Sequence, residues 1–408
     1  MRYFKFLLVT FIALSPALAK AQQADSLLTL QQCIQIALKS NLEVRKSSLD
    51  LARAKVDKNQ AKENLLPYIA AQVDHGVSNG RSPSGVDYSY VNSSIRFASY
   101  NANAGLTLFS GLQNLNKIKQ TSLAYKAGEM DLQQAKDLIT INTITAYLQV
   151  LNNTELLSQV DNQLSVSKQQ LARLEILEKK GANKQPSDLY DLKGIYADNQ
   201  VSYVTAKATL QTSKLNLLQI LNIPYKPDIA FQKFADVEIL KQENSSDEVY
   251  KTALNQLALI KAATLKRQSA EKGVAAAKGG LFPTISLFDN INTNISSAAK
   301  IGDANSATVP YWDQFKNNYY NSFGVTVRIP ILNYFQNRNK VTLAKIDLQE
   351  QKYVEENTRI KLRQDVEQAY LNMANAYDRY QTLQDQVKAY TESFRIAEIR
   401  FNAGVNLC

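Results

Sequence analysis

The chain has 408 residues, of which 47 are Lys or Arg, 37 are Asp or Glu and one is His. A hydrophobic content of 45% argues against a disordered chain. One histidine and two cysteines argue against a zinc site, a Cys–His dyad and a disulfide framework. Neither common nucleotide-binding glycine loop is present. We therefore expect a protein that is not an enzyme, with no catalytic, cofactor-binding or metal-binding residues and no cofactor.

The N-terminal residues 1–21 have the features of a signal peptide. Arg2 and Lys5 precede an apolar run, and Ala19-Lys20-Ala21 supplies small residues for cleavage before Gln22. The alternative is an N-terminal membrane anchor, but the apolar run is shorter than the ~20 residues that a spanning helix needs. The remaining positive charge is spread along the chain without a basic stripe interleaved with aromatic residues. We therefore expect an exported protein with no nucleic-acid partner.

An internal duplication organises the chain. Residues 29–70 align without gaps on 245–286 at an offset of 216, and residues 146–183 align on 369–406 at an offset of 223. Each copy opens with a capping-box pattern. The predicted organisation is a first repeat over 22–222, a linker over 223–244 and a second repeat over 245–408.

Each repeat is predicted to run from a helix through two strands to a very long helix. A helix of about 70 residues is roughly 100 Å long, and its apolar residues follow coiled-coil spacing, which we interpret as helix packing. In chain order, the first repeat has a helix over 29–65, strands over about 68–79 and 95–110, a long helix over 112–180 and a helix over 188–222. The second has a helix over 245–281, strands over about 284–297 and 319–331, and a long helix over 334–403.

The predicted strands are two-faced. Apolar residues such as Ile69, Val73 and Val325 alternate with polar ones, over lengths that suit tilted membrane strands. The alternative is a soluble sheet with one buried face. His75 falls on the apolar face, and we interpret it as an interfacial residue, not a ligand. Aromatic residues beside the polar hairpin tips are predicted to form an interfacial girdle: Tyr88, Tyr90, Tyr311, Trp312, Tyr319 and Tyr320.

Four short patterns and their order carry a family resemblance. These are the Leu-Thr-Leu-x-x-Cys-Ile-x-x-Ala-Leu-x-x-Asn start at Leu28–Asn41, the Leu-Leu-Pro and Leu-Phe-Pro junctions between helix and strand, the turn from Gly181 to Ser187-Asp188, and the Phe-Asn-Ala-Gly run at Phe401–Gly404. Together with the duplication, they resemble the TolC-like outer membrane efflux channel family over essentially the whole mature chain. The resemblance implies a mainly α fold with membrane β: long coiled-coil helices plus four transmembrane strands, contributing to a shared trimeric 12-stranded β-barrel and an α-helical tunnel.

The resemblance also implies a function. A member of the family is the outer membrane channel of a tripartite efflux or type I secretion system, a passive exit duct for drugs, toxins or polypeptides. It is a homotrimer in the outer membrane of a Gram-negative bacterium, in contact with outer membrane lipid, and its helices extend into the periplasm. Its partners are an inner-membrane pump and a periplasmic adaptor protein. The alternative is that the chain is itself such an adaptor, but an adaptor does not need four long two-faced strands.

The family positions its periplasmic entrance constriction just past the glycine turns. Ser187 and Asp188 match that position in the first repeat, and Asp191 follows one helical turn later. The competing interpretation of Ser187 and Asp188 is helix capping, and both roles are compatible. In the second repeat the residue aligned with Gln185 is Cys408, so we expect the final helix, equivalent to 188–222, to be missing and the chain to be a C-terminally truncated member.

Overall fold

The computed structural model describes residues 27–83, 90–181, 187–234, 244–301 and 307–402. The predicted signal peptide, Tyr88 and Cys408 lie outside these residues. The chain forms two compact units, one made of residues 1–47 with 134–240 and the other of 48–133 with 241–408. These units do not coincide with the two sequence repeats, because each takes part of the first repeat.

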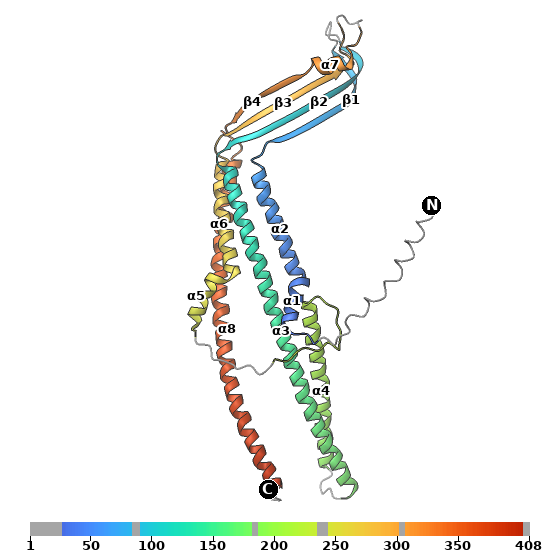
Figure 1. Cartoon of the computed structure of the whole chain (residues 1–408), viewed down its shortest axis with the longest axis vertical. Coiled ribbons are helices and arrows are strands. Elements are labelled where there is room, and N and C mark those ends of the chain that lie inside the picture. Colours follow the sequence, from blue (N-terminus) through green and yellow to red (C-terminus); the bar gives the residue numbers. More distant parts are fainter. Residues whose placement is uncertain (1–26, 84–89, 182–186, 235–243, 302–306, 403–408) are drawn as a thin grey trace, which may run out of the picture. The chain divides into compact units, whose positions relative to one another are not determined.

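The elements of the two repeats match in length (Figure 1). Helices α1 (Leu30–Ser40) and α5 (Ser246–Gln256) have 11 residues each, and α2 (Leu42–Glu63) and α6 (Ala258–Gly279) have 22. Helices α3 (Gln113–Lys179) and α8 (Gln336–Asn402) have 67 each. Both capping boxes are present, from Thr29 with Gln32 and from Ser245 with Glu248. The remaining long helix is α4 (Ser187–Ile220).

The single helices predicted over 29–65 and 245–281 are wrong, since each is two helices with a break at the same aligned position. Asn41 has φ −65° and ψ 131°, and Leu257 has φ −68° and ψ 133°. Each residue still donates its N–H to the carbonyl four residues earlier and therefore ends one helix just before the next begins. One extended residue leaves the apolar spacing on either side nearly unchanged. The pattern in the sequence therefore predicts one continuous helix where the structure has two.

The first unit has a core around Tyr147, which is 1% exposed. The single proton of the Tyr147 hydroxyl is shared between the Gln232 carbonyl at 2.7 Å and the Leu28 carbonyl at 3.0 Å. Phe231 lies edge-on to the Tyr147 ring at a centroid distance of 5.7 Å. The described part of the predicted linker is therefore packed into this unit, whereas the sequence suggested only a connection.

Cys33 is buried in the same unit, and burial raises the pKa of its thiol to about 11. A neutral, inaccessible thiol is a packing residue. The C-terminus of α4 closes with Asn222 at φ 53°, where the Ile223 N–H bonds to the Leu218 carbonyl at 3.1 Å. This is the left-handed cap that commonly ends helices.

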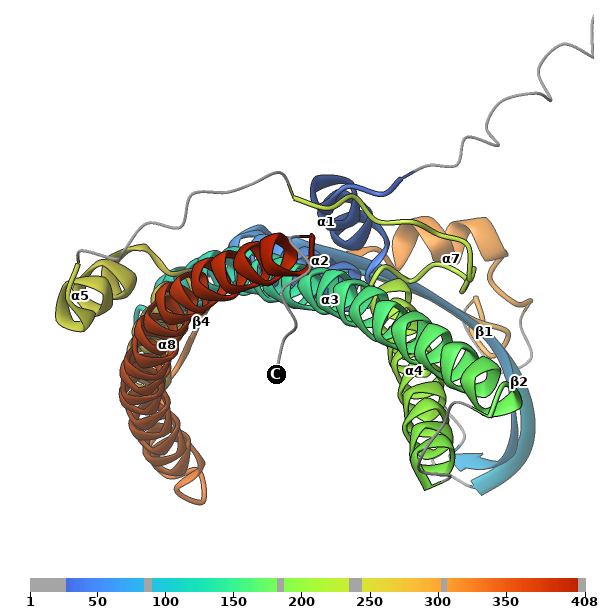
Figure 2. The ribbon, with the colours of Figure 1, turned by 90° about the horizontal axis from the view of Figure 1, so that it is seen from below.

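The second unit contains one antiparallel sheet in the order β1-β2-β3-β4, and the four strands lie side by side in Figure 1. The strands are β1 (Tyr68–Pro83), β2 (Tyr90–Ser110), β3 (Thr284–Ser296) and β4 (Tyr320–Arg328). Figure 2 shows β1 and β2 as a strongly curved ribbon. The hairpin between β3 and β4, expected to be a loop, contains the short helix α7 (Tyr311–Asn317).

The strand register confirms two distinct faces, corrects the alternation at one bulge and shows one polar exception on the apolar face. Ile69 pairs with Ala104, and Leu287 lies between Leu106 and Val325. A bulge between Thr107 and Phe109 puts Phe109 opposite Ile285, so that Phe109 takes the place expected for Leu108. Asp289 sits on the apolar face opposite Ala104 and Phe323, and its Oδ1 is buried with no hydrogen-bond partner among the described residues.

An ionic cluster joins α6 to α8 in this unit. The carboxylate of Glu355 accepts from Arg267 Nε at 2.6 Å, from Arg359 Nη2 at 2.7 Å and from the Thr264 hydroxyl at 3.0 Å. Burial raises the pKa of Glu355, but these three hydrogen bonds outweigh burial and leave the pKa below its ordinary value.

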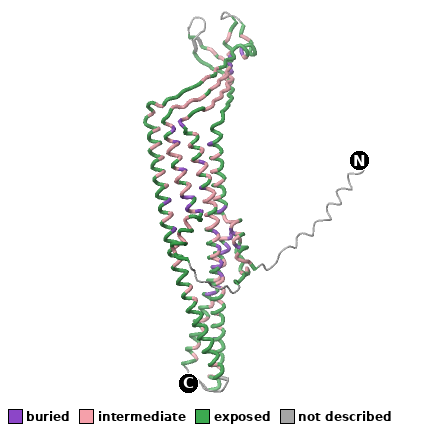
Figure 3. The backbone as a smooth tube through the Cα atoms, turned by 60° about the vertical axis from the view of Figure 1, so that its left-hand side comes forward, coloured by how far each residue is buried: buried purple, intermediate pink, exposed green. Residues whose placement is uncertain are grey.

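The later turns of α8 are exposed along their apolar stripe (Figure 3). Tyr390 is 67% exposed and Phe394 is 71% exposed. The described residues therefore do not provide the packing that the coiled-coil spacing predicts for this part of α8. No described helix combines the length and apolar character that a membrane span requires.

Candidate functional site

The predicted entrance residues lie at the start of α4, in the first unit. The preceding helix α3 ends at Lys179, and Gly181 has φ +66°, where a glycine avoids the strain of a side chain. Ser187 is the first residue of α4, and the residues just before it lie outside the described part of the chain. Asp188 lies in the first turn. All three predicted residues, Ser187, Asp188 and Asp191, have exposed side chains.

The entrance residues have simple chemistry. Among the described residues neither Asp188 nor Asp191 forms an ion pair, so their carboxylates stay open to solvent. Asp188 also complements the positive end of the α4 dipole, which is worth about 0.3–1 kcal/mol at an exposed site. The single chain brings these carboxylates close to one another on one helix but shows no constriction. Their convergence across subunits stays a prediction.

The polar face of the sheet carries three aromatic rings that lie over glycines of the neighbouring strand. A methyl group added to Gly105 would sit 2.3 Å from Tyr68 Cε1, and one added to Gly76 would sit 2.7 Å from Phe97 Cζ. The third pair is Phe288 over Gly324. Glycine in these positions lets each ring lie flat against the backbone, which keeps the ring from projecting away from the sheet and favours strand curvature. The other positions of this face include Asn101, Asn103, Asn290, Asn292 and Thr326.

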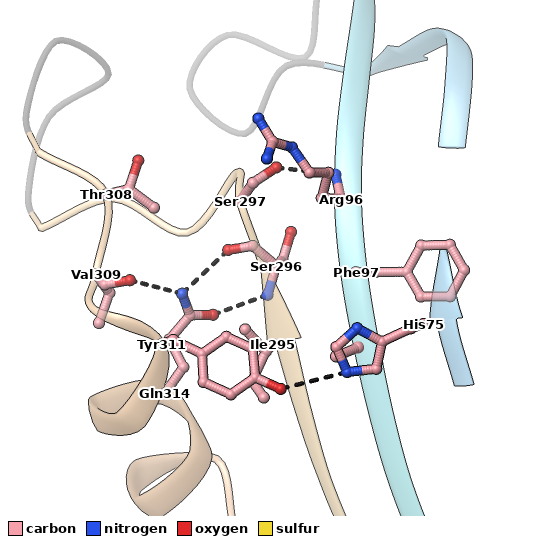
Figure 4. Close-up of a pocket in the computed structure, with 11 residues that line it drawn as sticks. His75, Arg96, Phe97, Ile295, Ser296, Ser297, Thr308, Val309, Tyr311 and Gln314 are labelled. Carbon is pink, nitrogen blue, oxygen red and sulfur yellow. Dashed lines mark hydrogen bonds between the residues drawn. The ribbon is translucent and has the colours of Figure 1, made fainter. Parts of the chain in front are cut away.

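The apolar face ends in a ring cluster between α7 and the sheet. Tyr100 OH lies 3.0 Å from His75 Nε2 and 2.6 Å from Tyr311 OH. Figure 4 shows Tyr311 OH directed at His75 Nε2, at a distance of 3.4 Å. Phe315 and Trp312 extend the cluster. The Phe315 ring centroid lies 5.3 Å from that of Tyr100 and 5.6 Å from that of Trp312. Tyr311 and Trp312, two of the six residues of the predicted girdle, thus belong to this cluster, and the girdle itself stays a prediction. His75 has aromatic hydroxyls as partners.

Gln314 fixes α7 to this end of the sheet. Its amide nitrogen donates to the carbonyls of Ser296 and Val309 at 3.1 and 2.8 Å, and its oxygen accepts from the Ser296 N–H at 2.9 Å. A cavity of about 290 Å³ remains between α7 and the sheet (Figure 4). No group of three or more metal-ligating side chains occurs in the described part of the chain.

The sequence prediction missed a second set of polar residues, where the sheet meets the helices. A cavity of about 820 Å³ is lined there by α3, α6, the end of β4 and α8. Among its lining residues are Lys117, Arg328 and Lys340. These residues lie far apart in the sequence, and no spacing rule connects them. The only available signal was that each is a cation at the polar end of a strand or within the first turns of a helix.

Comparison with known proteins gives consistent matches. Residues 249–406 match the model of the outer membrane efflux protein family. Outer membrane protein TolC of Escherichia coli is 26% identical over 332 residues, which cover 80% of this chain and 64% of TolC. Toxin and drug export protein A of Aggregatibacter actinomycetemcomitans is 23% identical, over 92% of this chain and 78% of that protein. The chain spans slightly less than two thirds of the length of the TolC proteins that it matches.

Solved structures with the same fold are outer membrane channels. The Campylobacter jejuni CmeC channel superimposes with a TM-score of 0.77 at 18% identity, over 96% of this chain and 82% of CmeC. The open state of the Neisseria gonorrhoeae MtrE channel gives a TM-score of 0.71 at 20% identity, over 92% of this chain and 80% of MtrE. The predicted resemblance and fold class are thus confirmed: in sequence and in fold, this chain is similar to the TolC-like outer membrane efflux channels.

Proposed function

We propose that the chain is one subunit of a trimeric outer membrane channel that serves as a passive exit duct for drugs, toxins or polypeptides. An inner-membrane pump and a periplasmic adaptor deliver the cargo, and the helices extend into the periplasm. The observation that carries this proposal is the two-faced sheet. The comparisons with efflux channels support it.

The apolar face of the sheet needs a cover. Ile69 is 79% exposed, Phe323 is 84% exposed and Val325 is 58% exposed in the single chain. Fully burying one such side chain is worth about 1.5–3 kcal/mol, and large contiguous apolar patches mark interaction surfaces. Hydrocarbon outside and water inside match the apolar and polar faces, and the tyrosine and tryptophan cluster between α7 and the sheet suits the boundary between them.

The edges of the sheet support the trimer. Among the described residues β1 pairs only with β2, and β4 pairs only with β3, so each sheet has two open edges. Open edges present unpaired backbone groups and readily pair with another chain. Joining β4 of one copy to β1 of the next is a head-to-tail contact, which closes into a ring when the rotation permits. Three copies supply the 12 strands of the proposed barrel. The alternative, a periplasmic adaptor, does not need a four-stranded sheet with one exposed apolar face.

Two neighbouring residues of β4 test the membrane assignment. Val325→Arg places a charge on the apolar face, which costs about 2–4 kcal/mol near the bilayer midplane. Thr326→Arg introduces the same charge on the polar face and should assemble nearly as well as wild type. The measurement is the yield of heat-modifiable trimer in isolated outer membranes. Equal yields for the two variants, or recovery of the wild-type protein without detergent in the periplasm, would contradict the proposal.

The entrance assignment has its own test. Three copies of Asp188 around a symmetric pore raise the local concentration of cations, so Asp188→Ala should lower the cation selectivity measured in planar bilayers. Asp198→Ala, which removes an exposed carboxylate later on the same helix, is the matched control. If selectivity is unchanged while the thermal stability of the helices falls, Asp188 acts only at the helix start.

A further inference from the structure

We propose that the cavity where the sheet meets the helices binds organic anions, and that cargo carrying sulfonate, phosphate or carboxylate groups is retained there. The inference deepens the proposed function, since retention of cargo rests on the chain acting as a duct. Binding itself needs only the folded chain. The cavity of about 820 Å³ has the size of a small-molecule site.

The charged residues that line this cavity are mostly cations. Lys117 from α3, Arg328 from β4 and Lys340 from α8 line it, and Asp347 is the one acidic residue among the lining side chains. None of the four forms an ion pair within the described residues. Lys117 Nζ donates only to the neutral Gln120 amide, at 3.2 Å. Three positive charges that share a space with a single carboxylate leave an excess that a bound anion would neutralise.

The uncharged lining also favours an anion. Gln113 and Asn114 of α3 contribute amide side chains. Helices α3 and α8 both begin at this junction, so the partial positive charge of their first turns adds to that of the side chains. The last carbonyls of α6, those of residues 277–279, accept from the N–H groups of residues 280–282, and the Gly280 carbonyl accepts from Asn337 Nδ2 at 2.5 Å. The lining therefore offers amide N–H donors beside the three cations.

The cation types and the walls indicate the class of ligand. Arg328 has a planar guanidinium that can bind two oxygens of a sulfonate, phosphate or carboxylate at once, whereas the two lysines act as point charges. Phe282 and Pro330 supply apolar wall area for the body of an organic molecule. Arg328 pairs in register with Thr284, which puts it on the polar face of the sheet, the side that faces the proposed lumen.

Binding can be measured with a defined probe. The full chain, purified in detergent, is titrated into a trisulfonated pyrene dye at low salt, and fluorescence anisotropy is recorded. Exchanging the three lining cations for glutamine should weaken binding by about tenfold or more, because focused charge raises the local concentration of counter-ions by such factors. The test triple is Lys117→Gln, Arg328→Gln and Lys340→Gln. The control triple is Lys119→Gln, Lys345→Gln and Lys352→Gln, which removes the same amount of charge from α3 and α8 at positions outside the cavity lining.

Each outcome decides the question. Weakening by the test triple alone, with binding retained when the lysines become arginine and Arg328 becomes lysine, supports the site. Equal weakening by both triples, or absence of dye binding to wild type at millimolar concentration, overturns it. Should the triple misfold by circular dichroism, the single variant Lys340→Gln against Lys345→Gln gives the same comparison.

Failure of the site and failure of the duct give different results. Dye binding that depends on the three cations, in a protein that never reaches the outer membrane, would refute the duct and leave the site standing. In a conducting channel, the test triple should shift the reversal potential in a KCl gradient towards cations, relative to the control triple. An unchanged reversal potential would overturn retention of anions in the duct.

Discussion

Replacing Gly111 by alanine should destabilise the junction between sheet and helices more than any ordinary glycine substitution. Gly111 has φ +61°, and the position of an added Cβ lies 2.3 Å from the Gly279 carbonyl oxygen and 2.6 Å from Phe282 Cβ. The left-handed conformation costs a non-glycine residue about 1–2 kcal/mol. The neighbouring atoms belong to the backbone and the root of a side chain, so α6 must shift, and overpacking of this kind costs about 1–3 kcal/mol.

The expected loss for Gly111→Ala is therefore about 2–5 kcal/mol, from the sum of these two costs. The assay is guanidinium unfolding in detergent, followed by the fluorescence of Trp312, which lies in the same unit. Gly80→Ala is the control, because an added Cβ there meets nothing within 4 Å, and the change should stay within about 0.5 kcal/mol. A Gly111→Ala variant as stable as the Gly80→Ala variant would refute the argument that backbone contact fixes this junction.

Two further predictions concern buried polar groups. Glu355→Gln should lower the stability of the second unit by about 1–3 kcal/mol, because two arginines lose a charged acceptor, while the exposed Glu356→Gln should change little. Because folding lowers the pKa of Glu355, this carboxylate stabilises the folded state above its unfolded pKa of about 4.3, and the stabilisation is lost as the pH falls through the lower folded pKa. Acid unfolding followed by circular dichroism should show this loss in wild type and not in Glu355→Gln. Tyr147→Phe should cost about 0.5–1.5 kcal/mol in thermal or denaturant unfolding, because the Gln232 carbonyl loses the hydroxyl donor and the Leu28 carbonyl keeps only the Gln232 N–H. A loss no larger than that of the exposed Tyr190→Phe would contradict the role assigned to the hydroxyl.

The two repeats reach similar backbones with different residues at one junction. Gly111 and Leu112 have φ 61° and 65°, and the aligned Tyr334 and Phe335 have φ 52° and 58°. Tyr334 is 90% exposed, so its side chain has room, whereas Gly111 is pressed against Gly279. The left-handed pair is thus a feature of the duplicated turn, while the requirement for glycine arises only where α6 packs closely.

Features with a local or periodic cause were predictable from the sequence. The capping boxes at Thr29 and Ser245, the glycine turn at Gly181 and the two-faced strands each follow from side chains a few residues apart. The two 67-residue helices follow from the near absence of glycine and proline. The aligned patterns also identified the family resemblance, which the comparisons confirm.

Other features depend on contacts between distant residues, and only the tertiary structure decided them. The break at Asn41 leaves the apolar period of the sequence intact. Helix α7 is held in place by hydrogen bonds from Gln314 to Ser296 at the end of β3. The linker residue Gln232 is held by its hydrogen bond to Tyr147. The side of the sheet on which Asp289 lies follows from its alternation with Leu287 and Ile291, but the burial of its Oδ1, which lacks a partner among the described residues, depends on the folded sheet. The cavity with Lys117, Arg328 and Lys340 is formed by residues from several elements that lie far apart in the sequence. Local spacing in the sequence cannot predict that these charges meet, because only folding brings them together.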